Sequence, residues 1–270
     1  MSGLGLSIPD VAGRARVALD SGAAALVARM SMAPDGARAG LIDALVRALK
    51  GAGIWAKLDL LYLMAAHDAQ AARLNWIAAA NDLSAVNSPA FTADRGYAGD
   101  AATSYLDTGW VPWGAAHFAL DSSAIGCWIN AGTDTGSDFA VAMGARDASN
   151  GAFVGPRGNA GSIRGRVNQA SSAASSGTVA NRQGLTALSR TASNLVSCYR
   201  GASLDGAFAT ASSARPTVAL WLGCLNANGA FSNGVDNRIA AAFAGAGLSG
   251  AEVAALHAAL AAYLTAVGGA

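Results

Sequence analysis

The chain has 270 residues and a formal net charge of +1, and charged residues make up only 13% of it. A balance so close to zero gives no basic surface, so nothing favours DNA or RNA as a partner. No run of 18 apolar residues is free of glycine or charge, and we expect no membrane insertion. The low charge suits a protein that packs against copies of itself or against other proteins.

The cysteine content indicates folding in a reducing cytosol. The chain has three cysteines, Cys127, Cys198 and Cys224, each in an apolar run. An odd number at wide spacing argues against a disulfide framework. The N-terminus also lacks a basic start followed by an apolar core, so no secretory signal is expected. Buried free thiols are the favoured interpretation.

Residues 1–33 are interpreted as an N-terminal arm, which could anchor the chain to a larger particle. Ser7-Ile8-Pro9-Asp10 resembles a helix start, with Ser as the cap and Pro in the first turn. Asp20-Ser21-Gly22 could instead turn a hairpin. The sequence leaves helix, hairpin and extended arm open.

Residues 34–83 are predicted to form a helical module of three short helices. Leu41, Ile42, Leu45, Val46 and Leu49 repeat on one helical face after Asp35-Gly36. A second helical run is expected over 54–62 and a third over 67–77. A module of this size is too small to be stable alone, so we expect it to pack on the next domain or on a partner.

Residues 84–247 are predicted to form an antiparallel β-sandwich. Short strand-like runs alternate with Gly, Asp and Asn turns along this stretch. A jelly roll is one way to close such a pair of sheets. The stretch 170–180 is a polar loop of low complexity. The expected strands are 91–93, 104–106, 124–130, 139–144, 162–168, 185–193, 195–203, 217–225 and 239–244.

Residues 248–270 are predicted to form a C-terminal helix packed on the sandwich. Ser249 followed by Glu252 three residues later is a capping box. Val253, Leu256 and Leu260 begin an apolar face at helical spacing. Glu252 is the single Glu of the chain, and helix capping accounts for it.

Two stretches resemble known families. The segment ADRGYAGD…SYLDTGW (93–100 and 104–110), with the apolar run before it, resembles bacteriophage, prophage and gene-transfer-agent structural proteins. The segment 220–264 resembles the closing part of concanavalin A-like (laminin-G-like) jelly rolls. The matching residues of this second segment are Gly223, Asn226, Gly229, Arg238, Ile239, Leu248, Ser249 and Glu252.

The resemblance implies a virion protein assembled in the bacterial cytoplasm, such as a head spike, head fibre or tail fibre. Its partners would be other virion proteins, further copies of itself in a homo-oligomer, and host surface polysaccharide. A purely structural adaptor or decoration protein of the head or tail is the alternative. The fold hosts lectins, glycosidases and inert adhesive modules alike, so it does not choose between them.

The residues argue against an enzyme. A retaining glycosidase needs two carboxylates about 5 Å apart, yet no Glu precedes residue 252 and no D-x-D pattern occurs on a strand. A serine hydrolase needs Ser, His and Asp in mutual reach, and no G-x-S-x-G elbow is present. His67, His117 and His257 are therefore interpreted as structural.

Two groups of residues remain as candidate sites. Asp134 and Asp138 lie in a glycine-rich loop that could hold calcium, although an ordinary turn is the favoured interpretation and no cofactor is expected. Trp110 and Trp113 flank Pro112 and could stack on a sugar ring, while Asn226 and Asn228 could hydrogen-bond it. Packing of the two tryptophans at the sandwich edge is the simpler alternative.

Overall fold

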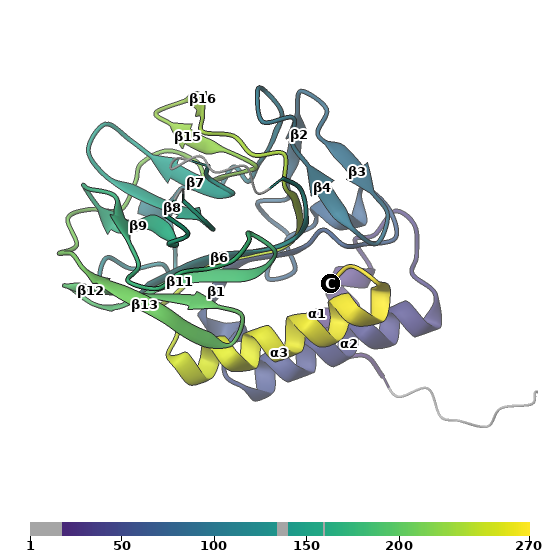
Figure 1. Cartoon of the computed structure of the whole chain (residues 1–270). Helices are drawn as coiled ribbons and strands as arrows, with labels where there is room; N and C mark the ends of the chain where they lie inside the picture. The colour runs from purple at the N-terminus through teal and green to yellow at the C-terminus, as the bar shows by residue number, and fades with distance from the viewer. Residues whose placement is uncertain (1–17, 134–139, 159) are drawn as a thin grey trace, which may run out of the picture.

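The computed structural model describes residues 18–133, 140–158 and 160–270. Two β-sheets are stacked face to face, and a layer of helices covers the far side of one of them (Figure 1). The predicted jelly-roll β-sandwich with a C-terminal helix is confirmed. Segment 1–17, which holds most of the predicted arm, lies outside the described residues.

The sheet next to the helices, called sheet A, has eight strands among the described residues. Its strand order is β13-β12-β11-β6-β17-β4-β3, and β1 also pairs with β17. All of these pairings are antiparallel. The strands are β1 (Leu58–Leu63), β3 (Ala90–Thr92), β4 (Gly96–Ala98), β6 (Ser123–Ala131), β11 (Gly184–Ala192), β12 (Leu195–Arg200), β13 (Ser203–Ala209) and β17 (Arg238–Gly245).

The second sheet, sheet B, lies on the side away from the helices (Figure 1), and nine of its strands fall within the described segments. Its order is β10-β9-β8-β7-β14-β5-β2; β15 pairs in parallel with β7, and β16 pairs with β15. The strands are β2 (Ser84–Val86), β5 (Tyr105–Asp107), β7 (Met143–Arg146), β8 (Gly151–Gly155), β9 (Arg164–Gln169), β10 (Ala173–Ala174), β14 (Trp221–Leu222), β15 (Leu225–Ala227) and β16 (Ala230–Ser232).

In the described part of the chain, three α-helices form the third layer, and each begins at a polar cap. They are α1 (Ser21–Val27), α2 (Gly36–Gly51) and α3 (Gly250–Val267). The side chain of Asp35 accepts a hydrogen bond from the backbone of α2 at Arg38. Short 3₁₀ turns occur at η1 (Trp55–Lys57), η2 (Ala71–Arg73) and η3 (Pro112–Gly114).

The central strands β1, β6 and β17 of sheet A are buried on both faces, because the second sheet covers one face and the helices cover the other. In β6, Ile125 and Cys127 face the core between the two sheets, whereas Ala124 and Trp128 face the helices. Burial on both faces explains why the sequences of these central strands are nearly continuous apolar runs and do not alternate between apolar and polar residues. Burial on this scale is the main source of stability in such a domain.

The second and third helices predicted within 34–83 are wrong. The run over 54–62 forms η1 and then β1, with Leu60 facing the inter-sheet core and Leu61 facing the helices. A short apolar run buried on both sides has no periodicity that separates a strand from a helix. The predicted helix over 36–51 is present as α2.

Segment 67–77 contains only the η2 turn, because a buried asparagine organises its backbone. Asn75 Oδ1 accepts hydrogen bonds from the N–H groups of Leu61 and Ile77, and its Nδ2 donates to the carbonyls of Asp59 and Ala80. Such side-chain bonds compete with the helical hydrogen-bond ladder.

The hairpin considered for residues 20–22 is also wrong. The Asp20 side chain accepts a hydrogen bond from the N–H of Gly22 at 2.8 Å and caps α1. Aspartate is a strong helix N-cap, and this role outweighs its turn preference here.

Helix α3 begins with the predicted capping box. Ser249 accepts a hydrogen bond from the N–H of Glu252, and the Glu252 carboxylate accepts one from the N–H of Ser249. By length and composition α3 could cross a membrane. In this fold its large side chains Val253, Leu256 and Leu260 pack in the core between sheet A and the helices.

Candidate functional site

The two tryptophans proposed to flank a sugar site lie in different environments. Trp110 is 7% exposed and packs edge-on against Phe118, with ring centroids 5.5 Å apart. It belongs to the core between the sheets and cannot stack on a ligand. Trp113 is 58% exposed, and the Arg215 guanidinium lies 5.6 Å from its ring centroid.

The two asparagines have backbone roles around β15 and β16. Asn226 is buried; its Nδ2 donates to the carbonyl of Ala219, and its Oδ1 accepts from the N–H of Gly229. Asn228 has a φ of +55°, which suits the left-handed conformation of the tight turn between the two strands. The structure therefore does not assemble Trp110, Trp113, Asn226 and Asn228 into one site.

The calcium option cannot be placed, because Asp134 and Asp138 lie outside the described residues. Among the residues described, no group of three or more His, Cys, Asp or Glu side chains could hold a metal ion. His117 Nδ1 lies 3.0 Å from Asp59 Oδ1, and the same carboxylate accepts the N–H groups of His117 and Phe118. This pair fixes the loop before β6.

A basic hollow of about 140 Å³ lies on the outer face of sheet B, which faces away from the helices. Strands β7, β8, β9 and β15 contribute to it. In these strands Ala145, Ala152 and Val167 point into the inter-sheet core, so the residues that alternate with them point outward. The hollow is lined by Ala140, Val141, Arg146, Phe153, Gly155, Arg164, Arg166, Ser172, Leu225 and Asn233. We call it the arginine hollow.

Strand register brings the walls of the arginine hollow together. Gly144 pairs with Phe153, and Phe153 pairs with Arg166, so the three residues form one row across β7, β8 and β9. Arg146 lies two residues beyond Gly144 on the same face. The guanidinium of Arg166 lies 5.7 Å from the Phe153 ring centroid, and its Nε donates to Ser172 Oγ at 3.2 Å.

Two glycines give the surface room for these long side chains. A Cβ atom on Gly144 would lie 2.5 Å from the Phe153 Cβ and 2.9 Å from the Leu225 Cδ1. A Cβ atom on Gly151 would lie 2.8 Å from the Arg166 Cδ. At Gly144 the added Cβ would meet the Phe153 Cβ, so this position requires glycine, whereas at Gly151 it would displace the flexible arginine stem.

Arg146 and Arg166 of the arginine hollow have no carboxylate partner among the described residues. None of the described lining residues is acidic. Burial, and then the neighbouring Arg146, lower the pKa of the Arg166 guanidinium. Like charges held close together in this way attract an anion.

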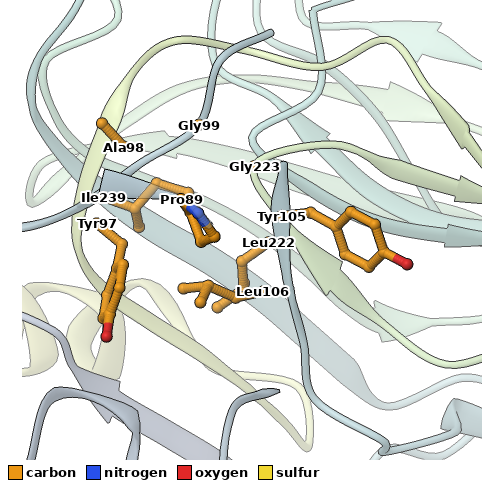
Figure 2. A pocket seen from close by; sticks show the side chains of 9 residues that line it. All are labelled: Pro89, Tyr97, Ala98, Gly99, Tyr105, Leu106, Leu222, Gly223 and Ile239. Atoms are coloured by element: carbon orange, nitrogen blue, oxygen red, sulfur yellow. The ribbon is translucent and has the colours of Figure 1, made fainter. Parts of the chain in front are cut away.

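A second cavity, at the sheet edges, is too small for a ligand. Figure 2 shows its lining between Tyr97 and Ile239 of sheet A and Leu106 and Leu222 of sheet B. Its volume is about 10 Å³, which is the space of a single water. The Tyr105 side chain points away from it and stacks on Trp221, with ring centroids 4.0 Å apart.

Comparisons with known proteins identify the fold. Neither a protein-family model nor a curated protein matches the chain. Among solved structures, the chain is similar to a Trypanosoma rangeli sialidase in complex with sialic acid. That match has 13% identity and a TM-score of 0.51, and covers 81% of this chain and 38% of that chain.

Two shorter proteins are also similar. Domain 4 of AbnA, an extracellular arabinanase from Geobacillus stearothermophilus solved with arabinotriose, matches with 13% identity and a TM-score of 0.47, over 74% of this chain and 98% of that chain. The CBM40 of Ruminococcus gnavus IT-sialidase matches with 15% identity and a TM-score of 0.39, over 51% of this chain and 83% of that chain. At these identities the likeness concerns the fold alone.

The sequence contained one signal for the arginine hollow. Arg164 and Arg166 alternate in a predicted strand, which places them on one face. The sequence could not show that Arg146 and Phe153 lie beside these two arginines. The strand β8 (Gly151–Gly155), which contains Phe153 and pairs with both β7 and β9, was not predicted.

Proposed function

We propose that this chain is a non-catalytic carbohydrate-binding protein whose binding face is the outer surface of sheet B. The arginine hollow is the single observation that carries the proposal. It is open to solvent, lies opposite the helical layer, and offers guanidinium donors beside an aromatic side chain. Sugar sites combine apolar surface with a few fixed polar groups in this manner.

The biological setting proposed is a phage-like particle that attaches to host surface polysaccharide. It rests on the sequence resemblance of 93–110 to virion proteins. Several copies on one particle would bind together, since multivalency raises avidity without new contacts. Mass spectrometry of purified particles from a producing strain is expected to detect the chain, and its absence from them would contradict this setting.

Site-directed blocking tests the binding face independently of charge. Ser172→Cys places one reactive thiol at the rim of the arginine hollow, and Ala44→Cys places one on the exposed face of α2. The native thiols Cys127, Cys198 and Cys224 are fully buried, and burial raises the pKa of each to about 12. Maleimide attached to polyethylene glycol therefore labels the introduced cysteine alone.

Binding would be measured by biolayer interferometry on immobilised surface polysaccharides from a panel of bacteria. We expect the labelled Ser172→Cys protein to lose binding and the labelled Ala44→Cys protein to retain it. Equal binding by the two labelled proteins would place the site elsewhere. No binding of the unlabelled chain to any member of the panel would overturn the proposed function.

The same panel tests the non-catalytic part of the proposal. The single Glu of the chain, Glu252, is held by the capping box and by Lys57, whose Nζ lies 2.5 Å from Glu252 Oε1. Retaining glycosidases need a close pair of carboxylates. Polysaccharide incubated with the protein is expected to keep its length in size-exclusion chromatography, and shortened chains would show a glycosidase instead.

A further inference from the structure

We infer that the carbohydrate recognised by the arginine hollow is anionic, and that Arg146 and Arg166 bind an oxyanion carried on its sugar rings. The inference rests on the proposed function and adds the chemical class of the ligand. Neutral sugars need hydroxyl partners of both kinds, donors and acceptors, because each hydroxyl can donate and accept. The charged groups of the hollow supply donors only.

The positions of Arg146 and Arg166 suit the binding of one oxyanion. Arg146 at the end of β7 and Arg166 in β9 project from the same face of sheet B, on either side of β8. Strands in a sheet lie about 4.8 Å apart. Two guanidinium groups separated by one strand can therefore approach a single carboxylate or sulfate from both sides.

The Arg166 guanidinium is also held in place by its neighbours. The Phe153 ring lies beneath the Arg166 guanidinium, Ser172 Oγ holds its Nε, and Gly151 leaves the space through which its stem passes. A guanidinium fixed in this way loses little conformational entropy on binding, and its fork matches the two oxygens of a carboxylate. Phe153 is accordingly a positioning residue.

The charges of Arg146 and Arg166 also favour an anionic ligand. Within the described residues, Arg29 pairs with Asp82 and Arg38 with Asp94, whereas neither Arg146 nor Arg166 forms an ion pair. Two cations held near one another without a described carboxylate cost stability through repulsion. An anionic ligand would remove the repulsion between Arg146 and Arg166, so binding would gain from it.

The experiment uses acidic bacterial polysaccharides and the same polymers after carbodiimide and borohydride reduction, which converts their uronic acids into neutral sugars on an unchanged backbone. Sulfated and desulfated heparin form a second matched pair. The full-length protein is titrated against each by biolayer interferometry. Arg146→Gln and Arg166→Gln remove one cation each, and Arg47→Gln on α2 removes an equal charge from the helical layer.

We expect binding to the acidic polymers, a loss of about tenfold or more after reduction or desulfation, and a similar loss in each hollow variant, because charged hydrogen bonds are strong. Arg47→Gln should bind as the original protein does. Binding should also weaken as salt rises from about 0.05 M to about 0.5 M. Loss on reduction identifies a carboxylate, and loss on desulfation identifies a sulfate.

The experiment distinguishes failure of the proposed function from failure of the anionic-ligand inference. Binding that survives reduction and the arginine substitutions, yet is blocked by the label on Ser172→Cys, would keep the proposed function and overturn the anionic ligand. Binding to none of the polymers would overturn both. Equal loss in Arg47→Gln would show a general charge effect, which also overturns the inference.

Discussion

Arg190 in β11 donates a hydrogen bond from Nη2 to Oε1 of Gln169 in β9 at 2.9 Å, and this contact ties sheet A to sheet B. Both side chains are fully buried. The same guanidinium donates to the carbonyls of Val167, Ser193 and Thr210. No carboxylate in the described chain forms an ion pair with it, so its charge is solvated by backbone oxygens.

Replacing Arg190 by methionine is expected to lower the free energy of unfolding by about 3 kcal/mol, because several buried carbonyls lose their donor. Urea denaturation followed by tryptophan fluorescence measures the change. Arg47→Met on the exposed side of α2 is the control, and its effect should stay within about 1 kcal/mol. Equal effects of the two substitutions would show that Arg190 does not hold the sheets together.

The loop containing η3 offers a matched pair of tryptophans. Trp110→Ala removes a ring that is 7% exposed and should lower the free energy of unfolding by about 3 to 5 kcal/mol. Trp113→Ala removes a ring that is 58% exposed and should change it by less than about 1 kcal/mol. Thermal unfolding of both variants tests the assignment, and a reversed order would contradict it.

Two glycines are expected to respond in opposite directions to alanine. Gly144→Ala places a Cβ against Phe153 and Leu225, and should destabilise the protein by about 1 to 3 kcal/mol. Gly40→Ala lies in α2 with no atom within 4 Å of the added Cβ, and should stabilise it by about 0.5 to 1 kcal/mol. Calorimetry of the two variants provides the measurement; a stable Gly144→Ala protein would mean that the outer face of sheet B is loosely packed.

Acid sensitivity is expected from His257. Its ring stacks on Trp128 with centroids 5.3 Å apart, and burial lowers its pKa below the ordinary value of 6.5. Between the two pKa values the unfolded state holds a proton that the folded state lacks, so stability falls as pH drops through 6.5 and levels off below the folded pKa.

The midpoint of urea unfolding at pH 7.5 and at pH 5 measures this effect. His257→Phe keeps an aromatic ring beside Trp128 but cannot take up a proton, so its midpoint should change less between the two conditions. An unchanged pH dependence in His257→Phe would assign the acid sensitivity to the carboxylates of the chain.

The sandwich and its C-terminal helix could be predicted because local signals agreed with the tertiary structure. The run around Cys127 is long and apolar, and Ser249 with Glu252 marks a helix start without ambiguity. The strand β1 could not be predicted, because burial on both faces removes the alternation that separates strand from helix. Asn75 shows the same limit, since two of its partners, Leu61 and Asp59, lie 14 and 16 residues away in the sequence.

The candidate site was harder to predict than the fold. Trp113 and Asn228 carry residue types that suit sugar binding, but residue type says nothing about which side chains meet. Phe153 lies between Arg146 and Arg166 through the pairings of β8, and these pairings depend on register. The two glycines that make room for them also look like ordinary turn formers in the sequence.

The three-layer order gives the molecule two chemically different sides. The helical layer exposes small residues such as Ala44 and Ala48 and an arginine, Arg47, that is paired with Asp43, whereas the outer face of sheet B carries the arginine hollow. A surface tether attached through α2 would therefore display every copy with its basic side toward the medium. Densely tethered copies would form a uniformly oriented coat in which every arginine hollow faces the medium.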